Sequence, residues 1–68
     1  MIEGTVKYIG ADGRFGMISR DDKQPKVFVH LSEARRFGLA ALEKGQRFRF
    51  ELQTAEDGRT SARLIELI

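Results

Sequence analysis

The sequence predicts an all-β domain in which five strands form an antiparallel barrel or a sandwich. Three observations lead to this prediction. Four short segments alternate in the manner of strands and a fifth strand follows near the end of the chain. Turn-forming residues separate several of these segments, and the one long stretch without alternation covers residues 32–46. A barrel suits a chain of 68 residues better than a sandwich, because closure leaves no exposed edge strand.

The first two predicted strands cover residues 5–9 (TVKYI) and 14–20 (RFGMISR). Between them stands Asp12-Gly13, a dipeptide typical of type I′ hairpin turns, in which both central residues need a positive φ. We therefore expect the two strands to form an antiparallel hairpin closed by such a turn.

The third predicted strand, KVFVHL at residues 26–31, has apolar side chains on both faces. Alternation places Val27 and Val29 on one face, and Phe28 and His30 on the other. A chain this small buries only about 60% of the surface that its unfolded form exposes. One of the two faces is therefore expected to stay exposed.

The segment that follows, residues 32–46, is predicted to be a long connection with one short helical turn. Ser32 is a typical N-cap residue, whereas Gly38 and Gly45 argue against a long helix.

Two further strands are predicted at residues 46–52 (QRFRFEL) and 59–67 (RTSARLIEL), with the turn TAEDG between them. If the second and third strands pair in antiparallel fashion, Phe15 and Met17 share the exposed face with Phe28 and His30. The expected core then consists of apolar side chains from four strands: Val6, Ile18, Val27, Val29, Phe48, Phe50 and Leu52.

The composition excludes several classes of function. The chain has no cysteine, which rules out disulfide bonds and thiolate metal sites, and its single histidine is His30. No second titratable group stands at a catalytic spacing from His30, so we expect neither an enzyme nor a metal or other cofactor. No basic region followed by an apolar run opens the chain, and no segment approaches the roughly 20 apolar residues of a membrane span. We therefore expect one soluble cytoplasmic domain over residues 1–68, with no membrane and no small-molecule substrate as partner.

The net charge of +2 is unevenly distributed. Residues 1–50 hold ten Lys and Arg against six Asp and Glu, whereas residues 51–68 hold two Arg against four acids. These basic residues either form an ordinary solvated surface or accompany a binding face. Single-stranded nucleic acid fits such a face, because every base has a π-face that stacks on an aromatic ring while nearby Lys and Arg follow the backbone.

Three stretches of the chain, "EGTVKYIGADGRFGMIS", "KVFVHLSE" and "GLAALEKGQRFRFEL", resemble the cold-shock domain, an oligonucleotide-binding barrel (OB-fold) of five antiparallel strands. The resemblance covers nearly the whole chain without gaps, and "RFGMI" and "VFVHL" stand where the family has its two ribonucleoprotein motifs. It implies binding of single-stranded DNA or RNA with low sequence specificity, and a role as nucleic-acid chaperone or as regulator of transcription or translation.

The same resemblance implies the residues of the binding site. Phe15, Phe28 and His30 fall on stacking positions of the family, Lys7 falls on a backbone-contacting position, and Tyr8 stands where the family usually has tryptophan.

The chain also departs from the family pattern at several of these positions. Met17 replaces a phenylalanine and is expected at the edge of the site, and Phe37 is expected to compensate for Leu39, which stands where an aromatic residue is common. The order Gly13-Arg14 is also reversed relative to the family, so Arg14 is expected to project an additional charge beside the site. Ile9 and Leu31 replace further phenylalanines.

A second function is compatible with the same residues: a protein-interaction or oligomerisation module in which the thinned aromatic face packs against another polypeptide. The long connection at residues 32–46 is also suited to act as a hinge for exchanging strands between two copies. The sequence thus predicts a monomer or a strand-exchanged homodimer.

Overall fold

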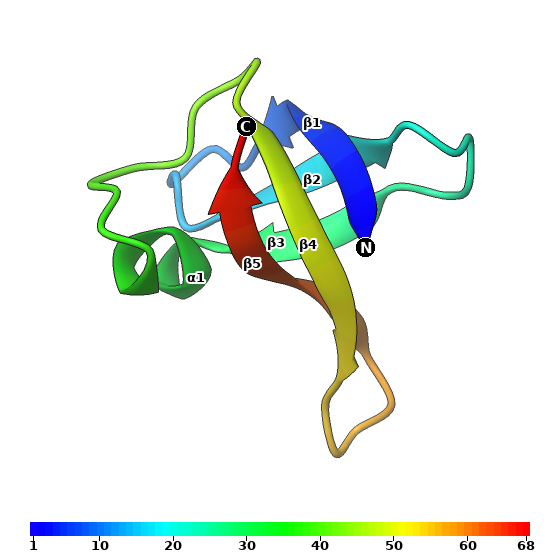
Figure 1. The fold of residues 1–68 in the computed structure, drawn as a ribbon. Helices are drawn as coiled ribbons and strands as arrows, with labels where there is room; N and C mark the ends of the chain where they lie inside the picture. Colours follow the sequence, from blue (N-terminus) through cyan, green and yellow to red (C-terminus); the bar gives the residue numbers. More distant parts are fainter.

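Five strands close into a barrel in the computed structural model, which describes residues 1–68 (Figure 1). The elements in chain order are β1 (Ile2–Ile9), β2 (Phe15–Arg20), β3 (Val27–His30), α1 (Leu31–Arg36), β4 (Arg47–Thr54) and β5 (Thr60–Leu67). The strands follow one another around the barrel in the order β1-β2-β3-β5-β4. The predicted all-β, five-stranded barrel is confirmed. No helix is long and apolar enough to cross a membrane.

One neighbouring pair of strands runs parallel, which the sequence did not predict. β3 and β5 meet in parallel at Phe28 and Ser61, whereas the other four neighbouring pairs are antiparallel. A closed ring with an odd number of strands cannot alternate in direction all the way round. One parallel contact is therefore the minimum that a five-stranded barrel requires.

The first hairpin differs from the predicted type I′ turn. Of its loop residues only Gly13 has a positive φ (72°), so the prediction that Asp12 also adopts one is wrong. The Gly13 N–H donates to the Gly10 carbonyl (2.9 Å), and the Gly10 N–H donates to the Phe15 carbonyl (2.9 Å). The loop is thus longer than two residues, and the Asp12 carboxylate accepts the Arg14 N–H inside it (3.0 Å).

The core contains ten buried apolar side chains, including six of the seven predicted. They are Val6, Ile18, Val27, Val29, Ala34, Leu42, Phe48, Phe50, Ala62 and Leu64. The exception is Leu52, which is 45% exposed and corrects the prediction that it points inward. It belongs to the last four residues of β4, all of which are exposed. The end of the β4–β5 hairpin extends beyond the barrel (Figure 1).

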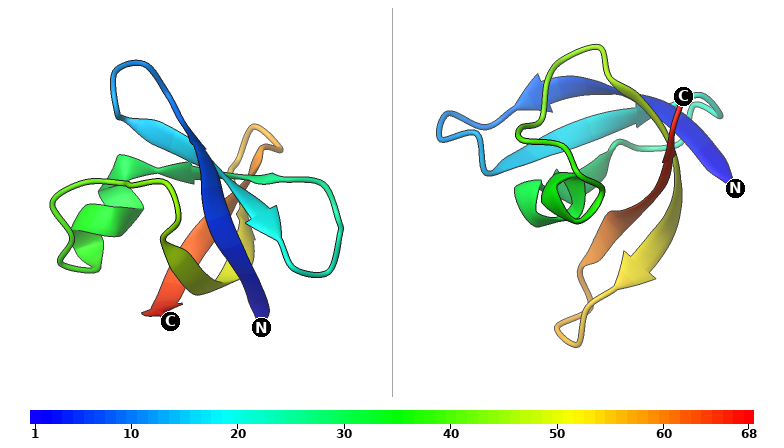
Figure 2. Two further views of the ribbon diagram at one scale, coloured as in Figure 1. Left: turned by 90° about the horizontal axis from the view of Figure 1, so that it is seen from above. Right: turned by 60° about the vertical axis from the view of Figure 1, so that its left-hand side comes forward.

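The predicted short helix is confirmed as α1, but its N-cap is His30 and not Ser32. The His30 backbone is extended (φ −95°, ψ 148°), and its ring Nδ1 accepts the Ser32 N–H at 3.1 Å. α1 and the loop after it lie at one end of the barrel (Figure 2). Two hydrogen bonds connect α1 to β5: Arg36 donates to the Leu64 carbonyl (2.7 Å), and Glu33 accepts the Leu64 N–H (3.1 Å).

Candidate nucleic-acid interface

The outer face of β2 and β3 carries the side chains that the sequence placed together. The antiparallel register aligns Phe15 with His30 and Met17 with Phe28. The intervening pair, Gly16 and Val29, is buried. The shared face of these four residues is therefore confirmed, and it lies on the opposite side of the strands from the core.

Four rings form a continuous series on this face. The ring centroids are 6.1 Å apart between Tyr8 and Phe15, 5.4 Å between Phe15 and Phe28, and 6.5 Å between Phe28 and His30. Phe15 and Phe28 are nearly parallel, with 13° between their planes. We call Tyr8, Phe15, Phe28 and His30 the ring row. Tyr8 is 50% and Phe28 is 38% exposed, so the row offers planar apolar surface to a ligand.

Tyr8 reaches the ring row because of an irregularity in β1. Val6 is opposite Ile18, but Tyr8 is opposite Met17. Lys7 is therefore an extra residue, a β-bulge in the pairing of β1 with β2. Strict alternation would put Tyr8 on the same side as the buried Val6. The bulge turns the tyrosine outward instead, and re-aiming a side chain in this way is a common effect of β-bulges. Lys7 itself is exposed beside the row.

The position of Phe15 depends on the glycine at the end of β1. The Phe15 ring lies directly over Gly10, where a Cβ atom would stand only 2.3 Å from the ring carbon Cε1. Phe15 is therefore half-buried. A residue larger than glycine at this position would displace Phe15 from its stack on Phe28.

His30 is held in place by the cap of α1. Its Nδ1 accepts the Ser32 N–H and lies 3.0 Å from the Ser32 hydroxyl oxygen. Because Nδ1 acts as an acceptor, the proton of the neutral ring is on Nε2, which has no partner within the protein. The ring is thus fixed in orientation while one face and one N–H group stay available.

Phe37 is not brought to the ring row. It meets the buried Phe48 edge-on, with 6.4 Å between centroids and 89° between planes, and packs against the core. Leu39, Leu31 and Ile9 also pack against the core. Phe37 is thus partly buried against the core and is not a member of the ring row.

Two hollows flank the ring row. One, of about 440 Å³, is lined by Phe28, Ala55, Asp57, Arg59, Thr60 and Ser61. The other, of about 500 Å³, is lined by Arg14, His30, Leu31, Ser32 and Arg35. Sequence reasoning missed Arg35 and Arg59, because only the closure of the barrel and the packing of α1 bring them beside the rings. The predicted Arg14 does stand next to the row.

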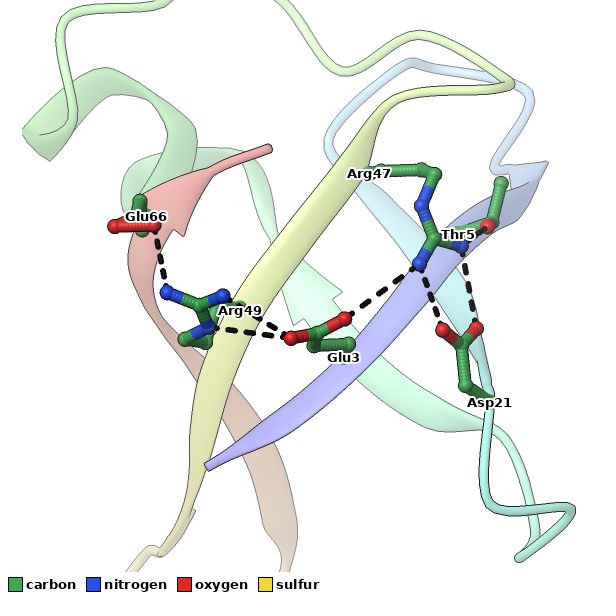
Figure 3. Close-up of polar contacts among 6 residues, drawn as sticks. All are labelled: Glu3, Thr5, Asp21, Arg47, Arg49 and Glu66. Carbon is green, nitrogen blue, oxygen red and sulfur yellow. Dashed lines mark hydrogen bonds and ion pairs between the residues drawn. The ribbon is translucent and has the colours of Figure 1, made fainter.

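Two arginines of β4, Arg47 and Arg49, are occupied by acidic partners. Figure 3 shows a line of ion pairs that runs from β5 across β4 and β1 to the turn after β2. We call it the ladder; its members are Glu66, Arg49, Glu3, Arg47 and Asp21. Arg49 donates to Glu66 (2.8 Å) and to Glu3 (3.1 Å), and Arg47 donates to Asp21 (2.6 Å).

The ladder also affects protonation. The hydrogen bond from Arg47 lowers the pKa of Asp21 below its ordinary value, and the same contact raises the pKa of Arg47. Both groups therefore stay charged over a wider range of pH than they would alone.

Comparison with known proteins identifies the family. The sequence model described as "'Cold-shock' DNA-binding domain" matches residues 2–68. The chain belongs to the cold-shock domain family. This family consists of nucleic-acid-binding proteins and not of enzymes, and cold shock proteins generally bind single-stranded nucleic acids.

Several relatives match over most of the chain. A probable cold shock protein, y4cH of Sinorhizobium fredii, is 43% identical over 63 residues, which cover 91% of each protein. The cold shock-like protein CspE of Escherichia coli is 36% identical over 66 residues, covering 97% of this chain and 96% of CspE. The glycine-rich protein 2 of Nicotiana sylvestris is 40% identical over 60 residues, which make up only 28% of its length. The predicted resemblance is thus confirmed.

Proposed function

We propose that this cold-shock domain acts in the cytoplasm by binding single-stranded DNA or RNA along the ring row, with low sequence specificity. Its role is that of a nucleic-acid chaperone or a regulator of transcription or translation. The single observation that carries the proposal is the series of four adjacent rings on an outer face of the barrel, with Tyr8 and Phe28 left 50% and 38% exposed.

The mechanism follows from the two kinds of side chain on this face. Bases stack on Tyr8, Phe15, Phe28 and His30, and Met17 fills the edge of the platform with a flexible side chain. Stacking on an aromatic ring contributes about 1–3 kcal/mol per base and tolerates any base. Low sequence specificity is therefore an expected property of the site.

The basic residues at the border supply the second part of the affinity. Lys7 and Arg14 are exposed beside the row and are suited to contact phosphates, which positions the strand without reading its sequence. Phe37 is left out of the proposed interface because its ring is engaged with Phe48.

The proposal is tested by fluorescence-anisotropy titrations of labelled single-stranded dT, single-stranded rU and duplex DNA at several salt concentrations. We expect single strands to bind more tightly than the duplex, because bases in a duplex are already stacked and cannot reach the rings. The logarithm of the binding constant should fall linearly with the logarithm of the salt concentration, as phosphate contacts require. Duplex binding of equal strength would overturn the proposal, and an affinity that salt does not change would favour a protein-interaction module.

A further inference from the structure

One end of the ring row opens into a hollow where no further ring follows His30. This hollow, of about 500 Å³, is lined by Arg14, His30, Leu31, Ser32 and Arg35, and we call it the Arg14–Arg35 hollow. One wall is Arg14, the residue before β2, and the other comes from α1 and its cap residue His30. The Leu31 N–H donates to the Arg14 carbonyl (2.8 Å), so the backbone holds the two walls together.

The two arginines of the hollow are poorly neutralised by the protein. The nearest carboxylate to the Arg14 guanidinium belongs to Asp12, at 4.0 Å, and the Arg14 side chain is 77% exposed. Arg35 has no acidic group within ion-pairing distance. These two side chains thus differ from Arg47 and Arg49, which donate to carboxylates in the ladder.

The acid closest to the hollow in sequence does not compensate for this charge. Glu33, on the same helix as Arg35, accepts hydrogen bonds from Arg36 (3.1 Å) and from the Leu64 N–H (3.1 Å). Its carboxylate is therefore engaged toward β5, and no carboxylate lines the hollow.

The chemistry of the lining favours a phosphate over a base. Apart from His30, which belongs to the ring row, no side chain of the hollow is planar and apolar; Leu31 supplies only an aliphatic wall. A guanidinium has five N–H donors in a planar fork that matches phosphate oxygens, often with two parallel hydrogen bonds. The hydroxyl of Ser32 adds a neutral polar group to the same space.

We propose that the Arg14–Arg35 hollow binds a phosphate group of the strand that lies on the ring row, so the nucleotide beyond His30 is held by its phosphate and not by stacking. This inference rests on the proposed function. The phosphate is either an internal phosphodiester or a terminal phosphate, and the two sources share the same oxygen chemistry. A terminal phosphate carries the larger charge, about −1.5 to −2 near neutral pH.

The test uses Arg35→Gln, with Arg63→Gln as the matched control. Both changes remove one exposed arginine that has no ion pair, but Arg63 lies on β5 and lines neither hollow. Each variant is titrated at several salt concentrations with labelled dT strands of one length that end in a 5′-hydroxyl, a 5′-phosphate or a 3′-phosphate. We expect Arg35→Gln to reduce the slope of log K against log salt by ~0.7, the value for one phosphate contact on a single strand. Arg63→Gln should leave the slope close to that of the unmodified chain.

The three strands identify the source of the phosphate. An equal loss on all of them assigns an internal phosphodiester to the hollow. A terminal phosphate is assigned if it tightens binding to the unmodified chain and if Arg35→Gln removes that gain. Equal slopes for Arg35→Gln and Arg63→Gln would overturn the inference while leaving the ring row intact. Failure of the unmodified chain to bind any single strand would overturn the proposed function and this inference together.

Discussion

Two arcs of the barrel use their outward-facing side chains in different ways. On β1, β4 and β5 the ladder joins Arg47 and Arg49 to carboxylates within the protein (Figure 3), and Arg47 also donates to the Thr5 hydroxyl at 2.8 Å. On β2, β3 and the end of β1 the ring row carries no ion pair, and Tyr8 and Phe28 keep 50% and 38% of their surface exposed. The side chains of the first arc hold neighbouring strands together, whereas those of the second are available to a ligand.

The difference shows why the net charge of the chain is a poor guide to its partner. The ladder contains three carboxylates and two guanidiniums, so it carries a net charge of −1 although it holds two of the arginines. Because the whole chain has a net charge of +2, the residues outside the ladder carry a net charge of +3. Lys7, Arg14 and Arg35 lack close acidic partners and stand near the rings. Attraction for phosphate is therefore expected to be strongest beside the ring row.

The largest expected effect separates two neighbouring residues of β3. Phe28→Ala should cost about 1–3 kcal/mol of single-strand affinity while the melting transition is largely kept, because the ring stacks on the ligand and not on the core. Val29→Ala should do the reverse, since Val29 is fully buried and its truncation leaves a cavity. Anisotropy titrations and thermal melts of both variants check this. If Phe28→Ala unfolds the protein as badly as Val29→Ala, the ring face is part of the core and the comparison fails.

A second prediction concerns His30, which serves both the ring row and the fold. His30→Ala should lower single-strand affinity by about 1–3 kcal/mol and, unlike Phe28→Ala, should also destabilise the chain by about 0.5–2 kcal/mol, because α1 loses its N-cap. His30→Asn is the informative control, since asparagine is among the best N-cap residues but has no ring. It should restore the melting temperature without restoring the affinity. An affinity that returns together with stability would mean that His30 acts only through the cap.

The part of this architecture that the sequence revealed is the part with local periodicity. Phe15 and Phe28 follow from alternation with a period of two, and so do the buried valines of β3. Alternation alone would place Tyr8 on the buried face, because the pattern does not reveal the bulge at Lys7 that turns this side chain outward. Leu52 was misplaced because alternation shows which face a residue is on but not where the barrel ends.

Long-range contacts account for the features that the sequence did not predict. The cap of α1 by His30 and the approach of Arg35 to Arg14 depend on how α1 packs against the barrel. Phe37 looked like a substitute for a missing ring because it is close in sequence to Leu39, yet Phe48 engages it. Proximity along the chain carries no information about which side of the connecting loop faces the core.

The third prediction, of a smaller effect, compares the salt dependence of binding after substitution of one arginine from each arc. Arg14→Ala should weaken binding to all sequences about equally and reduce the slope of log K against log salt by ~0.7, as expected for a phosphate contact. Arg49→Gln, in the ladder, should leave this slope unchanged, because Glu3 and Glu66 already neutralise Arg49. Titrations of the two variants with dT and with a mixed sequence measure both effects. An unchanged slope in Arg14→Ala would remove Arg14 from the site, and a reduced slope in Arg49→Gln would extend the binding surface onto the ladder.

The smallest expected effect is the pH dependence that the ladder gives to stability. Arg47 lowers the pKa of Asp21 in the folded chain, so Asp21 stabilises the fold while it is ionised, above about pH 4. That contribution should disappear as the pH falls through the lowered pKa and the carboxylate is protonated. Melting temperatures of the unmodified chain and of Asp21→Asn should therefore differ slightly at neutral pH and converge in acid. Asp22, whose pKa Arg20 lowers in the same way, is present in both chains and cancels in the difference. Because Asp21 belongs to the ladder, the variant should bind single strands as the unmodified chain does, and a loss of affinity at neutral pH would show that the two arcs are not independent.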